Sequence, residues 1–116
     1  SEGLAIIAFQ SKKIIDQFLH HELPAYTSST VTNPTQLRKL LSQIRKDDYV
    51  VAKDSYFEGF TGIAAPIRDY TGDVVSSIAV IGPNERLSED VYPLMIQEMK
   101  AAAEDISELL GYYGEE

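Results

Sequence analysis

The segment from residue 60 to residue 83 constrains the fold of this 116-residue chain more than any other, because it predicts a β-hairpin. Two apolar runs, at residues 60–68 and 74–81, flank the turn-forming sequence DYTGD. Apolar runs joined by a short turn of this composition are typical of paired antiparallel strands. The hairpin is therefore the expected centre of a small sheet.

Two closures of the turn are open, one with Asp69 opposite Val74 and the other with Tyr70 opposite Asp73. Both give the same pairing further along the strands, and the pairing decides which side chains share a face. The assignment of residues to the two faces of the hairpin is therefore the same for either turn.

One face of the hairpin carries Ile63, Ala65 and Ile67 and is an ordinary core face. The other face, here called the small-residue face, carries Gly62, Ala64, Pro66, Ser77, Ala79 and Ile81. Small residues on a sheet permit either the close approach of another backbone or a hollow for a ligand. Because empty space costs stability, the pattern alone favours packing, with a pocket as the alternative.

The rest of the chain predicts helices around this sheet. Asn33 followed by Pro34 indicates a helix start, with Asn as the cap and Pro at the first helical position. Pro93 lacks the amide that a helix interior needs, so the last helix is expected to start near Asp90. We expect helices over residues 4–9, 12–22 and 34–47, a strand over 49–52, the hairpin, and a helix over 90–110. The fold class is α/β (α+β), a layered arrangement with antiparallel pairing.

The charge balance argues against nucleic-acid binding by this chain itself. It carries 18 acidic and 10 basic residues, a formal net charge of −8. Affinity for phosphate backbones rests mainly on Lys and Arg. Without cysteine there is no disulfide and no thiolate zinc site, and no apolar run reaches the roughly 20 residues that span a bilayer. We expect a cytoplasmic location and no membrane partner.

No constellation of residues predicts catalysis or metal binding. His20 and His21 are neighbours on a predicted helix, so their imidazoles point about 100° apart and do not converge on one ion. The hydroxyls of residues 27–30 have no positioned histidine base. We therefore expect no enzyme activity, no metal and no cofactor.

Several segments together resemble the effector-binding domain of the IclR family of bacterial transcription regulators. The hairpin carries G-x-x-x-I-A-A-P-I-R-D at residues 59–69, G-x-V-V at 72–75 and I-G-P at 81–83. Further similar segments are G-L-A at 3–5, Y-T to T-N-P within 26–34, I-R to Y within 44–49, and A-A to L-G within 102–111. The resemblance covers nearly the whole chain.

The resemblance implies a GAF-like (profilin-like) antiparallel sheet flanked by helices. It also implies a sensor whose bound metabolite changes operator affinity through the arrangement of subunits in a homodimer or homotetramer. DNA would be bound only through an N-terminal winged helix-turn-helix, which this sequence lacks. Residues 1–116 are then expected to be a partial effector-binding domain without its first strands. A GAF-like dimerisation scaffold that binds no ligand is the alternative.

Positions that contact the effector in the family can be carried over one at a time. They fall first on Ser1, Glu2 and Gly3 at the entry to the first helix, where backbone amides can meet an anionic group. The others fall on Ala52 or Lys53 in place of an acidic residue, on Gly62 in place of a Cys-like residue, and on Ala79 and Ile81 in place of two serines. Ala64 shares the small-residue face with them. Because these departures remove hydrogen-bonding side chains, an apolar or aromatic effector is expected rather than a small hydroxy- or keto-acid. Lys53 could instead pair with a ligand carboxylate if it turns inward.

Overall fold

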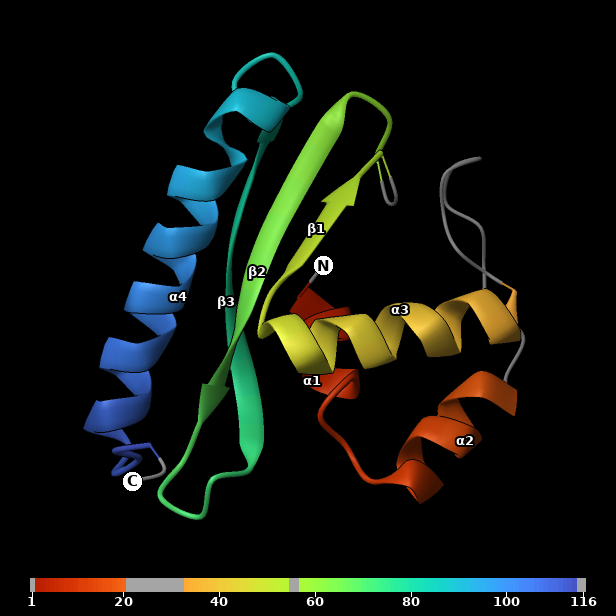
Figure 1. Cartoon of the computed structure of the whole chain (residues 1–116), viewed down its shortest axis with the longest axis vertical. Coiled ribbons are helices and arrows are strands. Elements are labelled where there is room, and N and C mark those ends of the chain that lie inside the picture. The colour runs from red at the N-terminus through yellow and green to blue at the C-terminus, as the bar shows by residue number, and fades with distance from the viewer. Residues whose placement is uncertain (1, 21–32, 55–56, 115–116) are drawn as a thin grey trace.

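A computed structural model of the chain describes residues 2–20, 33–54 and 57–114. The elements, in order, are α1 (Glu2–Ile7), α2 (Lys12–His20), α3 (Pro34–Asp47), β1 (Val50–Lys53), β2 (Phe60–Arg68), β3 (Val74–Pro83), a 3₁₀ turn (Glu89–Val91) and α4 (Tyr92–Leu109) (Figure 1). Within the described residues the strands form an antiparallel sheet in the order β1-β2-β3. The expected α+β architecture is confirmed.

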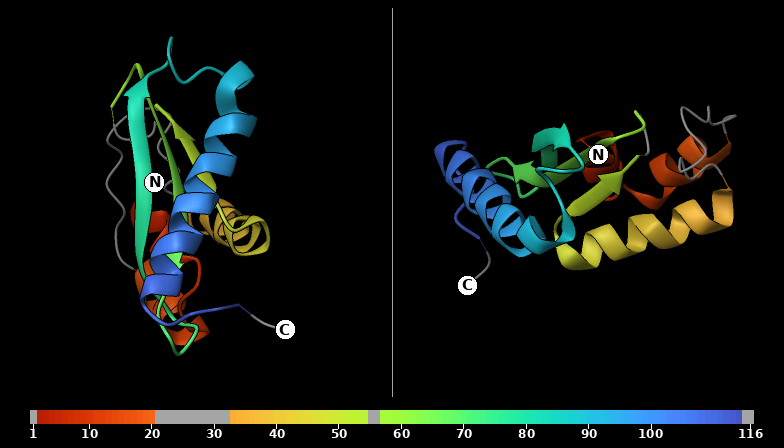
Figure 2. Two further views of the ribbon diagram at one scale, coloured as in Figure 1. Left: turned by 90° about the vertical axis from the view of Figure 1, so that its left-hand side faces the viewer. Right: turned by 90° about the horizontal axis from the view of Figure 1, so that it is seen from above.

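Helices cover both faces of this sheet. Figure 2 shows α4 on one side of the strands and the group α1, α2 and α3 on the other. On the α4 side, Ala65 and Ile67 of β2 pack with Ala103. On the opposite side, Ala64 packs in a cluster with Ala5 of α1 and with apolar residues of α2, α3 and β1. The core is thus divided into two layers by the sheet.

The sequence predicts the first residue of α3 correctly, through a capping residue followed by proline. The side-chain oxygen of Asn33 accepts hydrogen bonds from the backbone amides of Thr35 (2.9 Å) and Gln36 (3.1 Å). Pro34 is the first helical residue and has no amide to leave unsatisfied. The predicted range of residues 34–47 is confirmed. Asp48 ends the helix in a left-handed conformation, with φ of 67°.

The structure places α1 earlier than predicted. The helix begins at Glu2 rather than residue 4, contains Gly3, and ends at Ile7 rather than residue 9. The side chain of Gln10 donates to the carbonyl of Ile6 (3.0 Å) and to the carbonyl of Val74 in β3 (3.3 Å). This tertiary contact stabilises the turn that follows the helix, and sequence periodicity does not report it.

The hairpin has the predicted register along most of its length, and both predicted turn closures are wrong. The pairing shifts by one residue after Ile67 and Ser76, so that Arg68 lies opposite Val74. The amide of Asp69 then donates to the carbonyl of Asp73 (3.0 Å). Gly72 has φ of +87°, as expected for a turn followed by a glycine bulge.

Two further boundaries differ slightly from expectation. The strand β3 runs on to Pro83, two residues beyond its predicted end. Among the described residues it lies at the edge of the sheet, where proline is tolerated. The last α-helix begins at Tyr92, after the 3₁₀ turn, which leaves Pro93 in its first turn. Proline is acceptable there because the first amides of a helix have no intrahelical partner.

The end of α4 turns the chain back over the sheet. Gly111 has φ of +92°, and the amides of Gly111 and Tyr112 donate to the carbonyls of Glu108 and Ser107, both at 2.9 Å. This is a Schellman motif, which usually requires glycine at that position. A Cβ atom on Gly111 would lie 2.9 Å from the Cβ atom of Tyr70, so close packing demands glycine as well.

Arg68, at the end of β2, contacts three other segments. Its guanidinium forms hydrogen bonds of 2.8 and 3.3 Å with the carboxylate of Asp48 at the end of α3. It also lies over the rings of Phe9, after α1, and Tyr112, after α4, at 4.9 and 5.9 Å from their centres. Its amide donates to the hydroxyl of Ser107 (2.9 Å), which is buried in α4. These contacts are here called the Arg68 junction.

We expect Ala64→Leu to lower the free energy of unfolding by about 1–3 kcal/mol, because overpacking a filled core forces side chains and backbone to shift. Ala64 is fully buried beneath α1. Urea unfolding measures the effect. The matched control is Ala101→Leu, which makes the same change at an exposed position of α4 and should leave stability nearly unchanged. Equal stability of the two variants would contradict close packing at Ala64.

Candidate functional site

A cavity of about 310 Å³ lies between the beginning of α1 and the sheet. It is lined by Glu2, Gly3, Ala52, Phe57, Phe60, Thr61, Gly62 and Ile81. Ala52, Gly62 and Ile81 form one row across the sheet, because Gly62 pairs with Ala52 on one side and with Ile81 on the other. The volume is at the lower end of the range for small-molecule sites.

The small-residue face is therefore both packed and hollow, at different places along the strands. The row that contains Val50, Ala64 and Ala79 packs against Ala5 and Ala8 in the α1 segment. The adjacent row, with Gly62 at its centre, lies beyond α1 and lines the cavity. The two explanations that the sequence left open each apply to one part of the same face.

Hydrogen bonds to β3 hold α1 over the sheet. The hydroxyl of Ser77 donates to the backbone carbonyl of Glu2 (3.0 Å) at the beginning of the helix. Beyond its other end, Gln10 binds the carbonyl of Val74. Both partners belong to the same strand, so the orientation of α1 is defined at both ends. The backbone of Glu2, which lines the cavity, is thereby held against β3.

Two exposed aromatic rings form another wall. Phe57 and Phe60 are 71% and 45% exposed, and their rings meet edge to face with centres 6.5 Å apart. Exposed large apolar side chains next to a cavity are a common mark of a binding surface. Phe60 lies two residues before Gly62 in β2 and so shares the small-residue face, whereas sequence reasoning missed Phe57. The signal for Phe57 was an aromatic residue in a predicted loop.

A polar network supports the segment that carries these rings. The carboxylate of Asp54 accepts hydrogen bonds from the amide of Gly59 (2.7 Å) and from the side chain of Asn84 (2.9 Å). Thr61 donates its hydroxyl to the side-chain oxygen of Asn84 (2.7 Å). The hydrogen bonds from Asn84 and Gly59 favour the ionised carboxylate and hold the pKa of Asp54 below its ordinary value.

The remaining predicted site residues lie outside the cavity lining. Ala64 and Ala79 are in the row packed beneath α1, and Ser1 lies outside the described residues. Lys53 is exposed, and the alternation of side chains along β1 places it on the face opposite Ala52. Of the predicted set, the structure brings together Glu2, Gly3, Ala52, Gly62 and Ile81.

The lining gives this cavity a simple chemistry. It combines aromatic rings, aliphatic side chains and backbone, and Glu2 is its one formally charged residue among those that the structure describes. The hydroxyl of Thr61 is already bound to Asn84. No nucleophile with an adjacent base lines the cavity as described, so the arrangement is suited to binding rather than to covalent chemistry.

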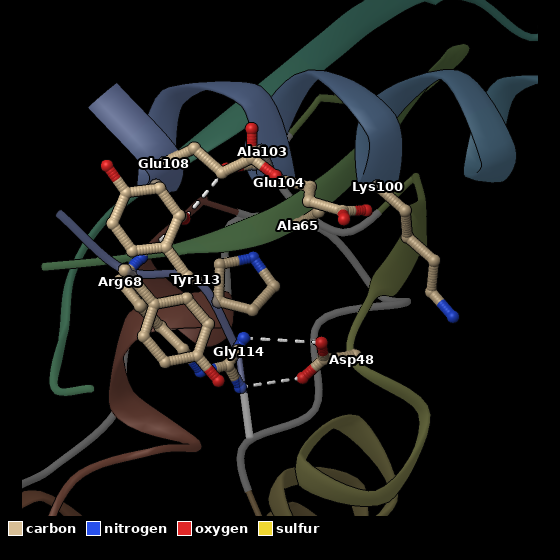
Figure 3. A pocket seen from close by; sticks show the side chains of 12 residues that line it. Asp48, Ala65, Arg68, Lys100, Ala103, Glu104, Glu108, Tyr113 and Gly114 are labelled. Atoms are coloured by element: carbon tan, nitrogen blue, oxygen red, sulfur yellow. Dashed lines mark hydrogen bonds and ion pairs between the residues drawn. The ribbon is translucent and has the colours of Figure 1, made fainter. Parts of the chain in front are cut away.

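A second cavity, of about 290 Å³, lies beside α4 and the end of β2. Figure 3 shows Lys100, Glu104 and Glu108 of α4 around it, with Arg68 bound to Asp48 opposite. Its charged groups are of both signs, and the guanidinium is already neutralised by a carboxylate at 2.8 Å. We regard it as part of the Arg68 junction and the first cavity as the better candidate site.

Residues 2–20, 33–54 and 57–114 contain no group of three or more His, Asp or Glu side chains placed to hold a metal ion. None of their helices is both long and apolar enough to cross a lipid bilayer.

Comparison with known proteins gives a consistent result. The family described as "Bacterial transcriptional regulator IclR C-terminal" matches residues 1–108. The transcriptional repressor AllR of Escherichia coli strain K12 is 33% identical over 100 residues, which are 86% of this chain and 37% of the repressor. The crystal structure of IclR from Thermotoga maritima superposes with a TM-score of 0.89 at 32% identity, covering 95% of this chain and 45% of that one. The C-terminal domain of the E. coli regulator KdgR gives 0.87 at 28% identity, covering 96% and 68%.

We expect Asn84→Ala to destabilise the protein at neutral pH and to have less effect in acid. Because the folded-state pKa of Asp54 is below 3.8, its ordinary value, the stabilisation from this carboxylate is present above pH 3.8. It is lost as the pH falls through the lowered folded-state pKa. Unfolding followed across this range should therefore show wild type and variant converging in acid. Gln97→Ala, at an exposed site on α4, is the control. A difference between wild type and Asn84→Ala that is independent of pH would contradict the role assigned to Asp54.

Proposed function

This chain belongs to the IclR family of bacterial transcriptional regulators, in which it corresponds to the C-terminal domain, and we propose that it senses a small-molecule effector in the cavity between α1 and the sheet. The relatives described above are transcriptional regulators rather than enzymes. The chain spans 37% of the length of AllR, so the activity of the whole regulator is part of the proposal.

The observation that carries the proposal is the row of Ala52, Gly62 and Ile81, which lines one cavity together with the beginning of α1. The family resemblance assigns effector contacts to these positions, and they border the same cavity. A conserved fold alone would support only the architecture, since function resides in the site.

The effector that suits this lining has an apolar or aromatic body. Phe57, Phe60 and Ile81 provide apolar contact area, whereas Ala52 and Gly62 contribute no side-chain hydrogen bonds. Small hydroxy- or keto-acids would leave polar groups unmatched on burial, which is costly. Hydrophobic walls with few polar groups are usual for ligand sites.

Regulation would follow from linkage between effector binding and DNA binding. An effector in the cavity contacts α1, the sheet and the segment with Phe57 at once, and so favours one arrangement of these parts. If that arrangement also favours one packing of subunits in a homodimer or homotetramer, effector binding changes the affinity for DNA. DNA binding then changes the affinity for the effector by the same factor. DNA itself would be bound by a separate domain, since this chain has a net charge of −8. The regulator would act in the cytoplasm.

We expect Ala52→Leu in the full-length protein to weaken the binding of neutral apolar compounds at least about tenfold, because the larger side chain occupies the cavity. Tryptophol, p-cresol and cyclohexanol are suitable probes, and calorimetry measures their binding. Ala101→Leu adds the same volume at an exposed site and should bind as wild type does.

The regulatory part is tested with a DNA sequence selected from a random pool by the full-length protein. Fluorescence anisotropy then compares DNA affinity with and without the compound that binds best. In the calorimetric test, an equal loss of ligand affinity in Ala101→Leu and Ala52→Leu would show that the ligand binds outside this cavity. If no probe binds and DNA affinity is unchanged by all three, the scaffold alternative replaces sensing.

A further inference from the structure

The Arg68 junction brings the end of the α1 segment together with the ends of α3 and α4. The guanidinium lies 4.9 Å from the ring centre of Phe9, which follows α1, and 5.9 Å from that of Tyr112, which follows α4. Its two hydrogen bonds to Asp48, of 2.8 and 3.3 Å, reach the end of α3 (Figure 3). A planar guanidinium can bind a carboxylate through two bonds and contact aromatic rings at the same time. One side chain thus joins three segments that are distant in the sequence.

The backbone of Asp48 adopts a conformation that other residues satisfy more easily. It lies in the left-handed region, with φ of 67° and ψ of 25°. Glycine is the usual residue there after a helix, because it has no Cβ atom to disfavour this conformation. Aspartate supplies the carboxylate that binds Arg68, which glycine would lack. Non-glycine residues held in this region cluster at ligand clamps and switch regions, so the contact with Arg68 is a candidate for more than stability.

The α1 segment connects this junction to the first cavity. Glu2 and Gly3, at the beginning of the helix, line the cavity, and Phe9 follows its end and contacts Arg68. Between them, Ala5 is fully buried against the sheet. A close-packed helix of this kind shifts as a unit rather than deforming at one end. A shift of α1 at the cavity therefore changes the position of Phe9 on the guanidinium.

We propose that Arg68 is a positioning residue of the sensor, which transmits occupancy of the cavity from α1 to the ends of α3 and α4. This inference rests on the proposed function, since it assigns the route by which that same cavity acts on DNA binding. Arg68 is not among the residues that line the first cavity, so it acts through Phe9 and α1. An effector that moves α1 changes the contacts around the guanidinium and thereby how firmly the segment after α4 is held.

The test measures two quantities in the full-length protein, with tryptophol, p-cresol and cyclohexanol as probes. Calorimetry gives the affinity for each probe. Fluorescence anisotropy on the selected DNA sequence gives the ratio of DNA affinities with and without the probe that binds best. Arg68→Met keeps an extended apolar side chain and removes the guanidinium. The variant should still bind the probe, whereas the ratio of DNA affinities should fall at least about threefold towards one.

Asp48→Gly separates this role from a merely structural one. It removes the carboxylate and permits the left-handed conformation without strain, so the urea midpoint of unfolding should stay near that of wild type. The ratio of DNA affinities should nevertheless fall as it does in Arg68→Met. The matched control is Arg38→Met, which breaks an exposed ion pair of 2.9 Å with Asp16 and should keep the wild-type ratio.

Tyr112 tests the contact with the segment after α4. Tyr112→Phe keeps an aromatic ring beside the guanidinium and should keep the wild-type ratio of DNA affinities. Tyr112→Leu removes the ring and should lower the ratio. Equal ratios in these two variants would show that the ring does not take part in transmission, and would overturn the route to α4.

The remaining outcomes separate this inference from the proposed function. A wild-type ratio in Arg68→Met or in Asp48→Gly would show that the inference is wrong while sensing stands. If Arg68→Met no longer binds the probe, Asp48→Gly alone decides. An equal fall of the ratio in Arg38→Met would assign the effect to surface charge and overturn the role of Arg68. If no probe binds wild type and DNA affinity does not change, sensing is rejected by its own test and this inference with it.

Discussion

The arrangement of this domain depends on the contact between α1 and the small-residue face of the sheet. Ala5 and Ala8 in the α1 segment are buried against a row that contains Ala64 and Ala79. Small side chains on both surfaces let the helix approach the strands closely, and in a close-packed interior this distance cannot change without strain. Glu2 and Gly3 at the beginning of this helix line the cavity, so the packing of α1 on the sheet also positions one wall of the cavity. The packed part of the face thus sets the dimensions of the hollow part.

The Arg68 junction fixes the other end of the same assembly. A guanidinium with a carboxylate partner and two aromatic rings is held by several weak contacts at once, and each contact belongs to a different segment. Phe9, one of these partners, follows α1 directly. The short helix therefore lies between the cavity at its beginning and the junction after its end. An effector that displaced α1 would have to alter the packing of Phe9 on Arg68 as well.

Local signals in the sequence predicted the elements well, and tertiary contacts decided what they could not. Asn33 with Pro34 identified the start of α3, because the asparagine side chain and the missing proline amide satisfy that helix end through local geometry. The hairpin register was predicted from two turn closures that are both wrong, and it holds because the bulge after Ile67 restores the predicted pairing. The bulge after Ile67 was not predicted, and the turn after α1 is stabilised by a contact with a distant segment, Gln10 with Val74. Membership of the small-residue face was predictable, but its division into a packed and a hollow part was not.

That division follows from the lengths of the elements. At 1.5 Å per residue, the six residues of α1 extend about 9 Å, whereas the nine residues of β2 extend about 30 Å. A helix of that length, tied to β3 near Val74 and Ser77, covers one part of the face and leaves the row with Gly62 uncovered. Small residues beneath the helix are needed for packing, and small residues beyond it leave space. Small residues therefore have opposite consequences two positions apart, close packing at Ala64 and open space at Gly62. The position of the covering helix α1 decides which of the two occurs.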